Sequence, residues 1–91
     1  RRAALRRSLA AAVESIPRGG GAEEVRLLSE GGGYRARLRI RMAGESREER
    51  LAAFLAPLSK SGWSVVDRKD GAATIERMEP AEPAGPAGPP R

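Results

Sequence analysis

The chain has 91 residues, 17 of them lysine or arginine and 12 acidic, which gives a formal net charge of +5. This length fits one domain. Cysteine and histidine are both absent, which excludes disulfides, catalysis by thiolate or imidazole, and zinc or haem held by these ligands. No apolar run approaches the roughly 20 residues that cross a bilayer as a helix.

The first sixteen residues have the apolar spacing of an amphipathic helix. Leu5, Leu9, Val13 and Ile16 form one apolar stripe along it, and their intervals of three and four residues match the helical repeat. Pro17 and the glycines after it predict the end of this helix.

A hairpin is predicted next. Residues 24–30 favour a strand with Val25 and Leu27 facing inward, and residues 31–33, all glycine, favour a turn. Residues 34–42 then alternate without interruption between apolar and arginine side chains, which predicts a strand with one wet face. The arginines on that face are Arg35, Arg37, Arg39 and Arg41.

A second helix follows Gly44. Ser46 and Glu49 have the spacing of a capping box, in which each side chain bonds a free backbone N–H of the first turn. Apolar residues at positions 51, 54, 55 and 58 form the buried stripe, and Gly62 is placed to end the helix in a left-handed conformation.

The second hairpin is centred on Asp70-Gly71, a pair that favours a type I′ turn. A two-residue loop pairs residues 63–69 with residues 72–78 so that Val66 faces Ile75. We therefore expect Val66 and Ile75 to point inward and Trp63 to lie at the rim of the core.

These elements predict an α+β fold, a two-layer αββαββ sandwich in which a four-stranded sheet carries two helices on one face. Residues 1–78 form this domain, and residues 79–91, rich in proline, are expected to be a disordered or polyproline II tail. The expected core consists of Leu5, Leu9, Val13, Ile16, Val25, Leu27, Leu38, Ile40, Leu51, Phe54, Leu55, Leu58, Val66 and Ile75.

The element order of residues 1–78 resembles the permuted ferredoxin-like periplasmic domains of inner-membrane proteins in type II secretion and type IV pilus assembly. The basic strand, the glycine, the apolar helix and the second hairpin carry this resemblance. It implies a scaffolding role through dimerisation of the domain, with no catalytic residues and no cofactor.

The four arginines on the wet face of residues 34–42, here called the arginine row, form a candidate binding surface. Four same-face residues span roughly 20 Å of strand, enough to follow a phosphate backbone. Against nucleic acid, no aromatic residue is expected on that face for base stacking. Glutamates on neighbouring strands, Glu24 or Glu30 and Glu76, are expected to neutralise part of the row.

We therefore expect a non-enzymatic interaction or assembly module, a piece of a larger or membrane-tethered protein. The candidate contacts are Arg35, Arg37, Arg39 and Arg41, with Trp63 as an interface candidate. A protein partner or a homodimer through a sheet edge is favoured, and nucleic-acid binding by the same arginines is the alternative. No catalytic set, metal site or cofactor is predicted. The start at Arg1 and the arginines near it slightly favour an extracytoplasmic, tethered location over a cytoplasmic one.

Overall fold

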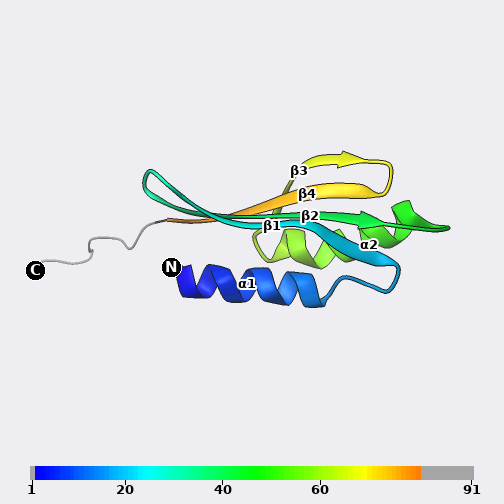
Figure 1. The fold of residues 1–91 in the computed structure, drawn as a ribbon, viewed down its shortest axis with the longest axis horizontal. Coiled ribbons are helices and arrows are strands. Elements are labelled where there is room, and N and C mark those ends of the chain that lie inside the picture. Colours follow the sequence, from blue (N-terminus) through cyan, green and yellow to red (C-terminus); the bar gives the residue numbers. More distant parts are fainter. Residues whose placement is uncertain (1, 81–91) are drawn as a thin grey trace, which may run out of the picture.

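The computed structural model describes residues 2–80, in which two helices lie on one face of a four-stranded antiparallel sheet (Figure 1). This arrangement confirms the predicted α+β class and the order αββαββ. The elements are α1 (Arg2–Glu14), β1 (Gly20–Glu30), β2 (Gly33–Met42), α2 (Arg47–Lys60), β3 (Ser64–Lys69) and β4 (Ala72–Pro80).

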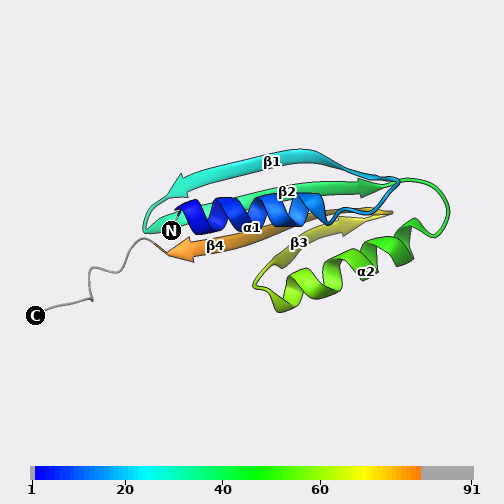
Figure 2. The same cartoon turned by 90° about the horizontal axis from the view of Figure 1, so that it is seen from below.

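The strands lie in the order β1-β2-β4-β3, so β2 and β4 are central and β1 and β3 form the edges. β2 is antiparallel to both of its neighbours. Its residue Leu38 faces Val25 on β1 and Ile75 on β4, which places the three side chains on the face that carries the helices. α1 packs on β2 and β4, and α2 lies beside β3 (Figure 2).

The core lies between the sheet and the helices. Leu5 on α1, Leu38 and Ile40 on β2, Leu51 on α2 and Ile75 on β4 are fully buried. Each was expected from its spacing, because one face of a helix and every second residue of a strand turn toward the same layer. Further buried apolar residues, outside the expected core list, are Ala12, Ala36, Met42, Trp63 and Ala73.

The second hairpin departs from the prediction at two residues, because its register differs from the one expected. Val66 is 53% exposed, and Trp63, expected at the rim, is only 4% exposed. A β-bulge between Val65 and Asp67 shifts the strand, so that Val65 rather than Val66 faces Ile75. A bulge inserts one residue and reverses the alternation beyond it, which carries Trp63 into the core.

Val25 is also wrongly predicted as a core residue. It lies on the helix side of the sheet, opposite the buried Leu38, yet it is 50% exposed. α1 covers the two central strands, and β1 extends beyond it (Figure 2). Its neighbour Leu27 packs against the core as expected.

The capping box at the start of α2 does not form. Ser46 has a left-handed backbone, φ 58°, and its side chain makes no cap hydrogen bond. Glu48, the residue before the predicted capping glutamate, accepts the backbone N–H of Gly71 and forms an ion pair with Arg68 at 3.2 Å. The first turn of α2 is thus fastened to the β3–β4 hairpin.

The Asp70-Gly71 turn has the predicted type I′ conformation, since φ is positive at both residues, 48° and 83°. β1 begins at Gly20, four residues before the predicted strand, and β4 continues to Pro80. Glu79 and Pro80 therefore belong to the sheet rather than to the predicted tail. The rest of that tail lies outside the described residues.

Candidate sheet-face binding site

The sheet face opposite the helices, here called the open face, carries the arginine row. The register places each arginine of β2 opposite one residue of β4. Because directly opposed residues share a face, the two strands alternate arginine with smaller or acidic side chains across this surface. The opposed pairs are Arg35 with Met78, Arg37 with Glu76, Arg39 with Thr74, and Arg41 with Ala72.

Glu76 pairs with two neighbouring arginines of the row, as expected. Its carboxylate accepts from Arg37 at 2.8 Å and from Arg35 at 3.1 Å. The Glu76 side chain is only 13% exposed, so this carboxylate is the most enclosed anion of the open face.

Arg41 is paired with Glu23, a residue outside the glutamates expected to neutralise the row. The two side chains meet at 2.7 Å, and both are well exposed. A bulge between Ala22 and Glu24 shifts the register of β1 here, which brings Glu23 to the arginine. Glu24, opposite Arg39 in the register, instead pairs with Arg26 at 2.9 Å.

Arg39 is the member of the row that no carboxylate neutralises within residues 2–80. Its Nε donates to the hydroxyl of Thr74 at 3.4 Å, a long hydrogen bond, and its side chain is exposed. No carboxylate of the described chain lies within ion-pair distance of it. A guanidinium with free donors is suited to receive an oxygen ligand from outside.

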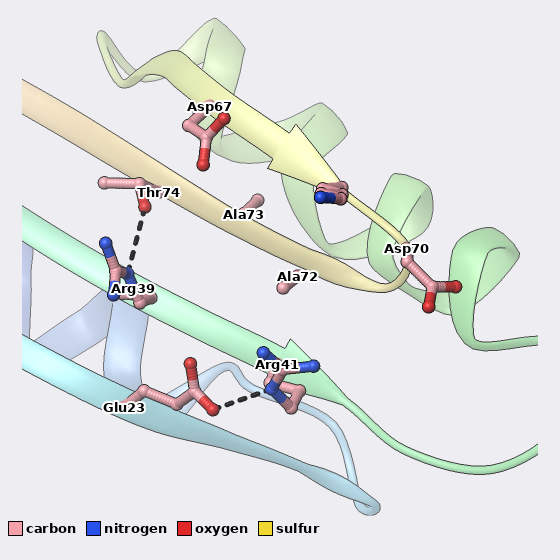
Figure 3. Close-up of a pocket in the computed structure, with 9 residues that line it drawn as sticks. Glu23, Arg39, Arg41, Asp67, Asp70, Ala72, Ala73 and Thr74 are labelled. Carbon is pink, nitrogen blue, oxygen red and sulfur yellow. Dashed lines mark hydrogen bonds and ion pairs between the residues drawn. The ribbon is translucent and has the colours of Figure 1, made fainter.

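Beside Arg39 the open face is hollowed. The hollow measures about 390 Å³, and Figure 3 shows the side chains around it. Its floor is formed by the small side chains of Ala72 and Thr74 on β4, and longer charged side chains surround it on β2, on β3 and near the start of β1. The lining residues are Glu23, Arg39, Arg41, Asp67, Lys69, Asp70, Ala72, Ala73 and Thr74.

The open face mixes cations with carboxylates. By register or by their contacts, the cations on it are Arg26, Arg35, Arg37, Arg39, Arg41 and Lys69. The anions are Glu23, Glu24, Glu30, Asp67 and Glu76, of which Glu30 is placed by the register of β1 alone.

The far end of the open face is apolar. Leu28 on β1 and Met78 on β4 flank Arg35 from either side, and Met78 is 61% exposed. An exposed methionine next to cationic side chains is a composition found in protein contact surfaces.

The aromatic side chains lie elsewhere. Trp63 and Phe54 are buried in the core, and Tyr34 is half-buried against it. Trp63, the interface candidate, therefore presents almost no surface in this structure. The open face of residues 2–80 offers no ring on which a base could stack.

Sequence reasoning identified the row and Glu76 but missed Glu23, Asp67, Lys69, Ala72 and Thr74 as parts of one hollow. The pairing of β3 with β4 near their turn was predicted, and it already placed Asp67 opposite Thr74. The missing information was the register between β2 and β4, which are joined through α2 and β3 and not by a turn.

Comparison of this chain with protein families, curated proteins and solved structures finds no match. Within residues 2–80, neither helix is long and apolar enough to cross a membrane. The same residues contain no group of three or more acidic side chains that could hold a metal ion.

Proposed function

We propose that this chain is a non-enzymatic protein-interaction module whose open face binds an acidic segment of a partner protein. Arg39 is the anchor, and the neighbouring hollow over Ala72 receives the partner's carboxylate side chain. The observation that carries the proposal is the exposed guanidinium of Arg39, whose bond within the described chain is the long contact to Thr74.

Charge and shape support this assignment. The exposed guanidinium of Arg39 attracts an acidic partner, and electrostatic complementarity raises the rate and specificity of association. Leu28 and Met78, at the other end of the face, add apolar surface to bury. The three acidic residues of the hollow, Glu23, Asp67 and Asp70, are exposed to solvent, unlike the enclosed carboxyl groups of acid–base catalysts.

The ion pairs disfavour nucleic acid as the ligand. Arg35, Arg37 and Arg41 already hold carboxylates, so a phosphate backbone would have to compete for three of the four arginines. Single-strand binders on sheet faces also stack bases on aromatic rings, and the aromatics described here pack in or against the core.

The strand order supports the resemblance that the sequence suggests. A ferredoxin-like βαββαβ sheet, cut before its first helix and rejoined, has the order β1-β2-β4-β3 in the new numbering, which is the order of this sheet. The strand order bears on the fold alone, and the proposed binding role rests on the residues of the open face.

The test is a titration of the isotope-labelled chain followed by amide NMR shifts, with a glutamate-rich peptide as the probe. We expect shifts on β2 and β4 around Arg39 and Thr74. Arg39→Glu should weaken binding at least tenfold, because it reverses the charge of the anchor. Arg7→Glu is the matched control, since it makes the same charge change on an exposed position of α1.

A parallel titration with a single-stranded oligonucleotide separates the two ligand classes. Binding of the oligonucleotide that is tighter than that of the peptide, and that falls steeply with salt, would replace the proposal with a nucleic-acid role. Peptide shifts on the helices, or equal loss in both variants, would contradict the open face as the site.

A further inference from the structure

The outer edge of β1 is the longest unpaired strand edge of the described chain. β1 has eleven residues and pairs only with β2. From Glu24 to Glu30 its register is uninterrupted. β3, the other edge, has six residues and a bulge in its middle. A regular edge strand presents unpaired N–H and C=O groups that a further strand can bond.

An apolar side chain at this edge is not covered by either helix. Val25 is on the helix side of the sheet but 50% exposed, because α1 sits over β2 and β4 (Figure 2). A strand added to β1 would flank Val25 and bury it.

The charges around Val25 are self-complementary. Glu24 and Arg26 flank it on the open face and form an ion pair at 2.9 Å. When two copies of a strand pair antiparallel about a twofold axis at residue 25, residue 24 of each copy faces residue 26 of the other. Each Glu24 then meets the partner's Arg26, and the two Val25 side chains meet at the axis.

Neighbouring registers lack this match. An axis at Arg26 places that arginine against itself, and an axis at Leu27 leaves Arg26 opposite an apolar residue, Leu28. An axis at Leu28 places Val25 opposite Gly31, where it stays uncovered.

From these observations we propose that two copies of this chain pair through β1, with Val25 at the twofold axis and reciprocal contacts between Glu24 and Arg26. The eight strands then form one continuous sheet, with the helices of both copies on one side and both open faces on the other. This contact does not depend on the function proposed for the open face.

Sedimentation equilibrium of the full chain, from about 10 µM to about 1 mM, tests the pairing. We expect a concentration-dependent dimer. Glu24→Arg and Arg26→Glu should each weaken it at least tenfold, because each places like charges opposite one another. The double variant Glu24→Arg/Arg26→Glu should restore it, which a merely structural role of either residue would not produce.

Two further variants give the controls. Val25→Asp should abolish the dimer. Val65→Asp makes the same change at a valine of similar exposure on the other edge strand, β3, and should leave the dimer intact. Circular dichroism of each variant checks that it folds. Arg39→Glu should leave the mass of the dimer unchanged. Failure of this proposal is therefore distinguishable from failure of the open-face function.

The register is tested by cross-linking, since the chain has no cysteine. Val25→Cys should give a disulfide-linked dimer under mild oxidation, and Leu27→Cys should give less. A wild-type chain that stays monomeric over the whole range, or a dimer that Val25→Asp and the charge reversals leave unchanged, would overturn the proposal. Preferential linking at residue 27 would overturn the stated register.

Discussion

Arg37 and Glu76 lie opposite each other on the two central strands, and the guanidinium Nε donates to the carboxylate at 2.8 Å. The same carboxylate also accepts from Arg35. Glu76 thus allows two cations to stand two residues apart on one strand face, where they would otherwise repel each other. This pairing joins β2 to β4 across the middle of the open face.

Removing the charge of Glu76 should therefore destabilise the fold. Glu76→Gln removes the carboxylate that Arg37 bonds and one of the contacts of Arg35, in a partly enclosed site, at a cost of about 1–3 kcal/mol. Urea unfolding measures the difference. Glu23→Gln is the control, because the exposed pair of Glu23 with Arg41 contributes about 1 kcal/mol at most. Equal losses in the two variants would contradict the central role of Glu76.

The burial of Trp63 has a spectroscopic consequence. It is the only tryptophan of the chain and is 4% exposed, so its emission should be blue-shifted in the native protein and move to longer wavelength on unfolding. Acrylamide should quench it weakly before unfolding and strongly after. Trp63→Ala should cost about 3–5 kcal/mol, as for other large buried side chains. Native emission typical of water-exposed tryptophan would place Trp63 at the rim after all.

Because of the bulge in β3, alanine substitution should affect stability differently at Val66 and Ile75, which the sequence predicts to face each other. Ile75 is fully buried, so Ile75→Ala should cost about 2–5 kcal/mol. Val66 is 53% exposed, and Val66→Ala should stay within about 0.5 kcal/mol. Thermal unfolding of both variants separates the registers. A large loss at Val66 would indicate that this valine, rather than Val65, faces Ile75.

Gly71 should not tolerate a side chain. Its φ is 83°, and an added Cβ would lie 2.7 Å from Cδ of Arg47. Gly71→Ala therefore combines the left-handed penalty of about 1–2 kcal/mol with a contact that Arg47 has to relieve. Gly32, in the β1–β2 turn, has open space around its Cβ position and no positive φ. Gly32→Ala should be close to neutral in the same denaturation assay, and a comparable loss in both would argue against the type I′ turn.

Much of the architecture could be predicted from local patterns. The unbroken alternation of residues 34–42 identified β2 and its arginine face, and Asp70-Gly71 identified the second turn and the pairing next to it. The capping box of Ser46 and Glu49 was predicted from spacing alone and does not form, because Ser46 has a left-handed backbone and its side chain makes no cap hydrogen bond. The neighbouring Glu48 bonds Gly71 of the β3–β4 hairpin, a partner more than twenty residues away in the chain.

The sequence by itself determined the order of the elements, the side of β2 that carries the arginines and the absence of cysteine and histidine chemistry. These properties depend on residue type and on periods of two or 3.6 residues, which act within a few neighbours. Tertiary structure alone decided the bulges at Glu23 and Val66, the burial of Trp63 and the exposure of Val25. It also decided which arginine is left without a carboxylate. Each of these depends on how strands distant in the chain align and on which strands α1 covers, and a one-residue shift in alignment exchanges the two faces of a strand.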